Sequence, residues 1–543
     1  MTVRTFAPLS RPRTVLLSGI FAAVLVTGAV WIQHAKNRVV VPTKISGVKL
    51  FEEVRDQLAD NYVDTLSEAR MYRMAMEGMV RELNDPYSVV LPPERLTRLN
   101  ERTTGTYAGI GLQVDLRDGY VVVVSPLPGG PGEQAGILTG DRIIEIDGKA
   151  VNGWAPDEVQ RLLRGAPGSK VKVTVQRGGS EAPVSFTLTR SAIHQSAVRR
   201  AAVMPGNVGY VELRVFSDST EDELRVAIAS LVRFGVRSLI IDVRANPGGL
   251  LEEGVRVSDL FLDRGQRIVS TKGRIADSNK EYDDQAPQLW PKLPIAVLVD
   301  DKTASAAELL AGALQDHDRA IIVGLPTFGK GSAQNVYPLE NSGALKLTTA
   351  RWYTPVGRSI SKLLPSSDDG PIGQPPKPPE YKTDSGRTVV GGGGIIPDIL
   401  VGDTTVSPEN LAFRHALGRK VGAFHDALAS FALRAKTTNA FRSPTFSITP
   451  AMLNDVYDRM LARGISIPRG TYDAASPLVS RLLSYEISRY VFGTDAEFQR
   501  KALDDKALLT AQRLLANAES QHAVFERAKQ QAQQQNQRQT PAP

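Results

Sequence analysis

A serine and a lysine that lie 25 residues apart are the side chains of this sequence best placed to do chemistry. Ser305 follows the apolar run IAVLV (295–299) and precedes AAELLAGALQ, a segment whose alanine and leucine content predicts a helix. Unpaired N–H groups at a helix N-terminus favour developing negative charge, so the N–H of Ala306 is a candidate oxyanion donor. The pattern predicts a serine nucleophile that needs a base.

Lys330 is the predicted base, because no histidine lies in the segment around Ser305 or in the segment around Lys330. A lysine amine can accept a proton where burial keeps it neutral. Lys330 lies between Gly329 and Gly331, where closely packed backbone would bury the amine. Gln334 is four residues further on and therefore shares a face with it, so its amide is a candidate to orient the amine. His317 is interpreted as a polar residue at a helix end. The alternative without chemistry is an N-capping serine and a loop lysine.

The two motifs, TASAAE and TFGKGSAQ, resemble in order and spacing those of the C-terminal processing peptidases, also called tail-specific proteases. The family pattern usually reads SASAAE, so Thr303 is a departure that replaces one hydroxyl by another. The resemblance implies that Ser305 is the nucleophile, Lys330 the general base and Gln334 the residue that positions the lysine. It also implies a crotonase-like α/β protease core, and residues 191–402 do alternate predicted strands and helices.

A third segment supports the resemblance. SLIIDVR (238–244) predicts a buried strand, and it leads through the turn NPGG into an amphipathic helix. In the resembled family this turn supplies the second oxyanion donor, which here would be the N–H of Gly248 or of Gly249. The sequence does not choose between the two. On its own, NPGG would indicate only a tight strand-to-helix connection.

Residues 101–190 resemble a PDZ domain, through TYAGIGLQVDL and above all AGI followed by GDRIIEIDG. In such a fold the backbone N–H groups of Gly109, Ile110, Gly111 and Leu112 would bind the terminal carboxylate of a peptide that adds a strand to the sheet edge. The alternative is a β-rich structural domain. Whether a PDZ domain here would activate or inhibit the protease is left open.

Other chemistries find little support in the sequence. It contains no GxSxG motif, which disfavours an α/β-hydrolase. The run GLPTFGKG (324–331) lacks the hydroxyl that a Walker A loop offers to magnesium, so nucleotide binding is a weak rival. There are no cysteines and no HExxH motif, and we expect neither metal nor cofactor. The net charge of +7 is spread without a basic run, which disfavours nucleic-acid binding.

The N-terminus predicts export. Three arginines precede an uncharged run of 18 residues (15–32), long enough to span about 27 Å as a helix. We interpret residues 1–35 as a signal peptide or membrane anchor, with the enzyme in the cell envelope on the extracytoplasmic (periplasmic) side, either anchored or secreted. The absence of cysteine is consistent with an exported enzyme.

The remaining segments are predicted to be mostly helical. Residues 44–100 form an N-terminal helical segment, and the turn NDPYS (84–88) is similar to one that precedes the PDZ domain in the resembled family. Residues 403–526 predict a helical C-terminal domain, whose role would be packing or dimerisation, or else the binding of an adaptor protein or the gating of the active site. Residues 362–393 are expected to form a mobile loop, and the glutamine-rich tail 527–543 is expected to be disordered.

Together these features predict a serine endopeptidase with a Ser-Lys dyad assisted by glutamine. It would process or degrade proteins from or near apolar C-termini, and we expect it to form a homo-oligomer. The alternative is a non-catalytic PDZ scaffold that binds C-terminal tails without cutting them.

Overall fold

The computed structural model describes residues 46–117, 120–151, 153–177, 182–340, 343–362, 378–402 and 407–539. It divides into two units, Met1–Pro86 and Tyr87–Pro543. The expected signal peptide or anchor (1–35) lies outside the described residues. Within the ranges that the structure describes, no helix combines the length and the apolar character needed to cross a membrane.

The first unit contains two helices, α2 (Gly47–Asn61) and α3 (Glu68–Arg81), but the segment 44–100 expected to be helical is not one unit: beyond Pro86 it continues into the second unit with strand β1 (Val89–Leu91) and the start of helix α4 (Pro93–Thr104). Helices α2 and α3 contact each other through aromatic and polar side chains. The rings of Phe51 and Tyr72 lie 6.3 Å apart, and Arg55 donates a hydrogen bond of 2.7 Å to the Tyr72 hydroxyl. Most of the apolar side chains of the two helices remain exposed.

A six-stranded sheet forms the centre of the second unit, in the order β10-β11-β12-β15-β16-β21. Only β10 runs antiparallel to its neighbour, and all other pairs are parallel. The strand carboxyl ends of β12 and β15 therefore meet at one edge, where ligands of open α/β sheets bind. The strands are β10 (Val198–Met204), β11 (Val208–Leu213), β12 (Ser238–Asp242), β15 (Ile295–Val299), β16 (Ile321–Gly324) and β21 (Ile399–Leu400).

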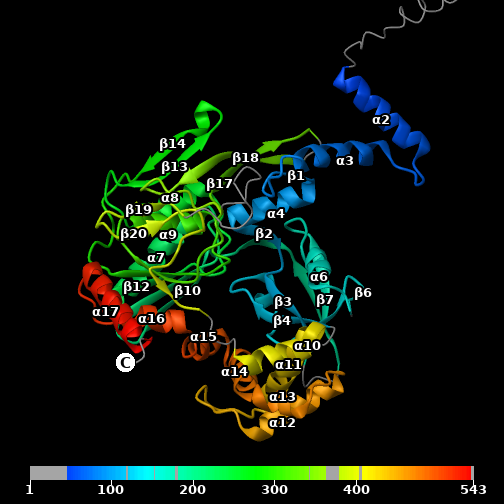
Figure 1. The fold of residues 1–543 in the computed structure, drawn as a ribbon. Helices are drawn as coiled ribbons and strands as arrows, with labels where there is room; N and C mark the ends of the chain where they lie inside the picture. The colour runs from blue at the N-terminus through cyan, green and yellow to red at the C-terminus, as the bar shows by residue number, and fades with distance from the viewer. Residues whose placement is uncertain are drawn as a thin grey trace, which may run out of the picture. The chain divides into compact units, whose positions relative to one another are not determined.

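Both faces of this sheet are covered by helices, which explains why SLIID and IAVLV are fully buried. Leu239 and Ile241 face a core shared with α7 (Thr220–Arg233), α8 (Leu251–Asp259) and α9 (Ala306–Asp316). Ile240 faces the opposite core, shared with α16 (Lys506–Leu515) and α17 (Gln521–Gln539). Figure 1 shows these last two helices, in red, against the sheet that carries β10 and β12.

A second, antiparallel sheet is built from strands that alternate along the sequence with those of the first, and its strand β17 begins two residues after Lys330. Its order is β1-β18-β13-β14, and β17 also pairs with β18. The strands are β1 (Val89–Leu91), β13 (Arg267–Gly273), β14 (Lys280–Asp283), β17 (Ser332–Pro338) and β18 (Ala344–Tyr353). A short hairpin, β19 (Glu380–Lys382) and β20 (Thr388–Val390), occupies part of the segment expected to be a mobile loop; residues 363–377 of that segment lie outside the described residues.

The predicted PDZ segment folds as its own β-rich domain with a separate core of thirteen buried apolar residues, among them Ile143, Val159 and Val173. Helix α4 (Pro93–Thr104) precedes it. One sheet has the order β3-β4-β5-β7-β8 with β6 on β5, and β2 pairs with β9 outside it. The elements are β2 (Thr106–Gly109), β3 (Leu112–Arg117), β4 (Tyr120–Pro126), α5 (Pro131–Gln134), β5 (Arg142–Ile146), β6 (Lys149–Ala150), α6 (Pro156–Leu163), β7 (Lys170–Gln176), β8 (Val184–Thr189) and β9 (Ser191–His194).

The C-terminal helices belong to two different cores rather than to one helical domain over 403–526. Five of them surround a core of their own: α10 (Pro408–Leu417), α11 (Val421–Thr437), α12 (Pro450–Ala462), α13 (Arg469–Ala474) and α14 (Ser476–Ile487). The segment from α15 (Thr494–Ala502) onwards returns to the central sheet, because Phe498 and Leu508 pack there. The tail also differs from the expected disorder: α17 extends to Gln539, and its Gln, Ala, Lys and Arg residues have good helix propensity.

Candidate active site

All six residues predicted for the catalytic and oxyanion roles line one cavity of about 360 Å³. They come from three separate segments: the start of α9, the turn after β12 and the segment that leads into β17. The residues are Ser305, Ala306, Lys330, Gln334, Gly248 and Gly249. The structure therefore brings together side chains and backbone groups that lie up to 86 positions apart in the chain, from 248 to 334.

Ser305 occupies a strained connection between β15 and α9. Its φ of 57° and ψ of −120° are unusual for a residue with a side chain, and such strain is retained where the surrounding structure holds it in place. Ser305 is the N-cap residue of α9, and its N–H donates to Glu308 Oε2 at 2.8 Å, whereas no hydrogen bond among the described residues ends on its hydroxyl. The residue is half-buried and lines the cavity at the start of the helix.

The N–H of Ala306, the first residue of α9, is available at this point. No hydrogen bond among the described residues uses it, whereas the N–H of Ala307 is bonded to the Ala304 carbonyl. The next N–H groups of the helix begin the regular pattern, with Leu309 donating to the Ser305 carbonyl. An unpaired N–H beside the nucleophile, at the positive end of a helix, suits an oxyanion.

The turn after β12 packs directly against the nucleophile. A side-chain carbon added at Gly248 would lie 2.7 Å from the Cβ of Ser305, and one added at Gly249 would lie 1.9 Å from the Phe216 carbonyl oxygen. Only glycine fits at these positions. The Gly248 N–H donates to Asn246 Oδ1 at 2.8 Å, while no hydrogen bond of the described chain uses the Gly249 N–H. Of the two alternatives left open by the sequence, Gly249 therefore has the unoccupied donor.

Polar groups tie this turn to the loop that carries Ser305. Asp300 Oδ1 accepts hydrogen bonds from the N–H groups of Ala245 (2.9 Å) and Thr303 (2.9 Å). The Thr303 hydroxyl donates to the Val243 carbonyl at 2.9 Å, and the Ala304 N–H donates to the Asn246 carbonyl at 2.9 Å. Thr303 is fully buried, so the residue that departs from the family pattern holds the two loops together through its hydroxyl.

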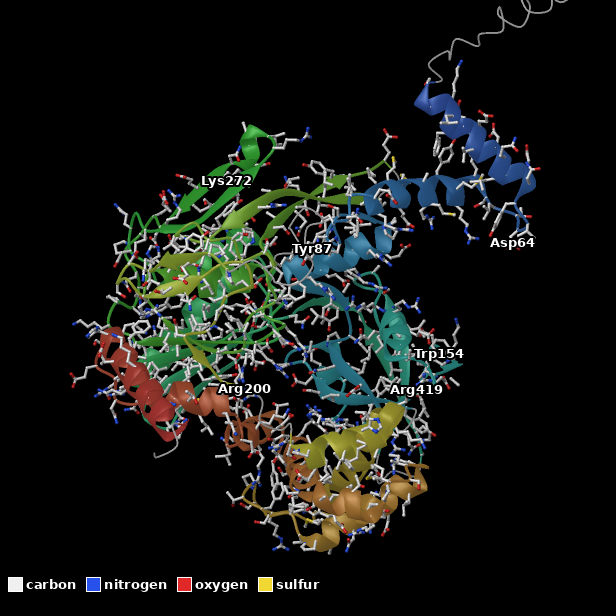
Figure 2. The ribbon with its side chains drawn as sticks, in the orientation of Figure 1. Asp64, Tyr87, Trp154, Arg200, Lys272 and Arg419 are labelled. Carbon is white, nitrogen blue, oxygen red and sulfur yellow. The ribbon has the colours of Figure 1, made fainter. Side chains whose placement is uncertain are left out.

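Lys330 lies in the closely packed glycine segment that the sequence predicts. Side-chain carbons added at Gly329 and Gly331 would lie 2.9 Å from Lys362 Cγ and 2.7 Å from Ser361 Oγ, respectively. The Lys330 amine lies 4.8 Å from the centre of the Tyr87 ring, which is labelled in Figure 2. An aromatic face and closely packed glycine backbone around a half-buried amine reduce its contact with water.

Gln334 lies on β17 and lines the same cavity as Lys330. Its amide nitrogen donates to the hydroxyls of Ser332 (2.9 Å) and Thr348 (3.2 Å). Those two bonds fix the side chain, and the carbonyl oxygen of the amide is left as the group that can accept a hydrogen bond. An oxygen that accepts is the group needed to orient a lysine amine.

Glu308 is the residue that the sequence reasoning missed. Its side chain is fully buried, and its two oxygens accept four hydrogen bonds. Oε2 accepts from the N–H groups of Ser305 (2.8 Å) and Lys330 (2.9 Å), and Oε1 accepts from the Thr327 hydroxyl (2.5 Å) and the Gly329 N–H (2.6 Å). Burial raises the pKa of this carboxyl, although the four hydrogen bonds oppose the shift. The signal was present, since a glutamate three residues after an N-terminal serine is a capping-box pattern.

Two other sequence interpretations are resolved by the structure. His317 ends α9 and bonds to Asp384 (2.7 Å) and to the Arg267 carbonyl (2.7 Å), and it does not line the cavity. The glycine loop 324–331 leads into strand β17, whereas a phosphate-binding loop leads into a helix N-terminus. The nucleotide-binding interpretation therefore fails on topology as well as on the missing hydroxyl.

The four residues predicted to bind a peptide carboxylate, Gly109, Ile110, Gly111 and Leu112, line a second cavity of about 280 Å³. No hydrogen bond in the described part of the chain uses the N–H groups of Ile110 and Gly111. Two cationic side chains that the sequence reasoning did not identify line it too: Arg164, paired with Glu101, and Arg214, an exposed residue that follows β11. Free amides and positive charge suit a terminal carboxylate.

Comparison with known proteins identifies two regions of the chain. The model of peptidase family S41 matches residues 207–366, and that of a PDZ domain matches residues 122–177. A carboxy-terminal-processing protease of Bartonella bacilliformis is 36% identical over 337 residues, which cover 61% of this chain and 75% of that protein. The carboxy-terminal processing protease CtpA of Bacillus subtilis is 35% identical over 307 residues, covering 56% and 65%.

Among solved structures, the photosystem II D1 C-terminal processing protease is 30% identical, with a TM-score of 0.35, over 66% of this chain and 90% of that one. The fold is that of an S41 protease with a PDZ domain and additional helical segments. The non-catalytic scaffold is thereby excluded as the description of the whole chain. The chain belongs to peptidase family S41, among the carboxy-terminal processing proteases, and is a serine-type protease.

Proposed function

We propose that this chain is an endopeptidase in which Ser305 is the nucleophile, Lys330 the general base and Gln334 the residue that orients the lysine. The observation that carries the proposal is the shared cavity, in which the strained serine, the half-buried lysine and the unpaired amides of Ala306 and Gly249 converge. No cofactor takes part in this chemistry.

The reaction is acyl transfer in two steps. The neutral amine of Lys330 takes the proton of the Ser305 hydroxyl as Oγ bonds to the carbonyl carbon of the scissile peptide, and the carbonyl oxygen becomes an anion held by the amides of Ala306 and Gly249. The intermediate collapses, the C–N bond breaks, and protonated Lys330 gives its proton to the leaving amine. A water molecule then attacks the acyl-enzyme with Lys330 again as base, which releases the acid and restores Ser305.

A serine-reactive peptidyl phosphonate, used with hydrolysis of a peptide substrate, tests the assignment. Wild type should be labelled and active, Ser305→Ala should be neither, and Lys330→Arg should be inactive because arginine keeps its proton at any usable pH. Chelators and thiol reagents should change nothing. Activity of Ser305→Ala, or of Lys330→Arg near that of wild type, would exclude the dyad.

The PDZ domain is proposed to bind the free, apolar C-terminus of a protein substrate. The support is the cavity at residues 109–112, with its free amides and the charge of Arg214. The neighbouring strand β3 can pair with an extended peptide. Amidating the C-terminus of a substrate should slow its binding or cleavage, because the negative charge that the amides receive is lost. Equal cleavage of free and amidated substrates would contradict this role.

Location and assembly are further proposals. The charged and apolar pattern of residues 1–35 favours a membrane anchor or signal peptide and an extracytoplasmic enzyme. Exposed apolar side chains on α2 and α3 favour a homo-oligomer formed through these helices: Val48, Leu50, Phe51, Val54, Leu58, Met74 and Met79. The C-terminal helices are the proposed site for an adaptor protein. Light scattering on the protein with and without Leu50→Glu and Val54→Glu would test the oligomer.

A further inference from the structure

Arg244 follows strand β12 and begins the turn that carries Gly248 and Gly249, which is called the oxyanion turn below. Its guanidinium lies between two carboxylates. On one side Asp242 accepts from Nε at 2.9 Å and from Nη2 at 2.6 Å. On the other side Asp505 accepts from Nη1 at 3.0 Å, and its second oxygen lies 2.7 Å from Nη2. These contacts raise the pKa of the arginine further above its usual value, in spite of its burial. Each carboxylate thus binds the guanidinium through two contacts, which fixes its plane as well as its position.

Asp505 comes from a distant part of the chain. It lies 261 residues beyond Arg244, outside the 207–366 segment that matches the peptidase family, and it is the N-cap of α16. Helix α16 is docked on the sheet by buried apolar residues, including Leu508 and Leu514, and these are independent of the carboxylate. Loss of the Asp505 charge should therefore leave the helix in place and affect mainly Arg244.

The backbone that follows Arg244 is held in an unfavourable conformation. Ala245 has a positive φ of 56°, and Gly248 has a φ of 85°. Such a turn keeps its shape only where several contacts determine it. Within the turn, the Ala245 N–H donates to Asp300 and the Asn246 amide donates to the Leu213 carbonyl. At its start, the Arg244 guanidinium is bound by two carboxylates. Tyr210 further fixes Asp242 by donating a hydrogen bond of 2.8 Å to its Oδ2.

We propose that Asp505 is a positioning residue for the oxyanion turn: by holding Arg244 against Asp242, the C-terminal helix α16 keeps the amide of Gly249 directed at the reacting carbonyl. The inference rests on the proposed role of that turn as oxyanion donor. It assigns to α16 a part in catalysis besides packing. Asp505 does not touch the substrate and acts only through Arg244.

The test is Asp505→Asn in the full-length protein, with hydrolysis of a short peptide substrate that does not engage the PDZ domain. Asparagine remains a good N-cap but loses the charge that binds the guanidinium. Asp504→Asn is the matched control, because Asp504 is the adjacent carboxylate and bonds to Tyr485 instead of Arg244. A peptidyl boronic acid provides a second measurement, since its tetrahedral adduct places an anionic oxygen in the oxyanion site.

We expect Asp505→Asn to lower kcat about tenfold with KM within twofold of wild type, because misplaced donors cost transition-state and not ground-state binding. The inhibition constant of the boronic acid should rise by about the same factor. For Asp504→Asn, kcat, KM and the inhibition constant should each stay within twofold of wild type. The unfolding temperatures of both variants should lie within a few degrees of that of wild type. Unchanged kcat in Asp505→Asn, an equal loss in Asp504→Asn, or a change confined to KM would overturn the inference.

If Asp505→Asn does not fold, Arg244→Lys tests the same clamp, because lysine keeps the charge and loses the two-sided contact. Where all variants fold, the double variant Arg244→Lys/Asp505→Asn should have a kcat no lower than that of the slower single variant, since both changes break the same contact between Arg244 and Asp505. Losses of kcat that multiply independently would contradict the proposed role of this contact. Failure of the proposed function is a distinct result: it would appear as activity in Ser305→Ala, whereas a wild-type kcat in Asp505→Asn with Ser305 essential would refute only the role of Asp505.

Discussion

Replacing Glu308 by glutamine should disable the enzyme although Glu308 is not proposed to exchange protons with substrate. The carboxylate accepts four hydrogen bonds, three of them from backbone N–H groups that can only donate. A glutamine amide has one accepting oxygen and one donating nitrogen. In the better of its two orientations, the glutamine nitrogen takes the place of Oε1 and faces the Thr327 hydroxyl and the Gly329 N–H. The hydroxyl can rotate to accept a hydrogen bond from this nitrogen, but the N–H of Gly329 cannot accept one. At least one buried donor is left without a partner.

The size of the effect follows from those contacts. One orphaned buried donor costs about 1–3 kcal/mol, and the bonds that remain to a neutral oxygen are weaker than those to a carboxylate, so the total is about 2–4 kcal/mol. Because Glu308 joins the N–H of Ser305 to that of Lys330, displacement of the lysine segment is the easiest way to relieve the strain. If all of the energy appears there, kcat falls about 30- to 1000-fold.

The assay is kcat for a fluorogenic peptide, corrected for folded enzyme by thermal unfolding. Glu253→Gln is the matched control: Glu253 is also fully buried and accepts from the Glu221 N–H (3.1 Å) and from Arg256, but it does not line the active-site cavity. It should lose stability and keep kcat within about threefold. A kcat for Glu308→Gln within twofold of wild type, or equal losses of kcat in both variants, would refute the reasoning.

Two further predictions concern the PDZ loop and pH. Gly111→Val should weaken binding of a free apolar C-terminus by tenfold or more without changing hydrolysis of a short peptide, since Gly111 has a φ of 68° and an added Cβ would lie 3.2 Å from Gly130 Cα. Calorimetry with free and amidated peptides checks this, and undiminished binding contradicts it. Burial, together with Asp259, raises the pKa of Asp284 to about 7. The folded state then holds a proton that the unfolded state has lost, so the free energy of unfolding should fall as pH rises from about 4 to 7, by at most about 4 kcal/mol. Asp284→Asn should flatten that slope in denaturant titrations, and an unchanged slope excludes Asp284 as its source.

Local patterns in the sequence predicted the parts of the site that depend on local structure. A helix after Ser305, a strand before Gly248 and glycines around Lys330 follow from propensity and from backbone freedom, and the structure has all three. The residue types then indicated a common chemistry, and the structure brings them to one cavity. Their catalytic roles, and the crotonase-like description of the core, stay predictions that rest on the family resemblance.

What could not be predicted depends on contacts between distant segments. The three central residues of β12, Leu239, Ile240 and Ile241, are apolar, so the sequence shows that both faces of the strand are buried but not by which helices. Nothing local in LDDKALLTAQRLL (503–515) indicates that it packs on the protease sheet, so its pattern predicts packing with the neighbouring helices. The sequence therefore gives no sign of Asp505, whose proposed role depends on lying opposite Arg244. A carboxylate at a helix N-terminus is ordinary in a sequence, and the positioning role proposed for Asp505 arises only because the fold places it against Arg244, at the start of the turn that carries Gly248 and Gly249.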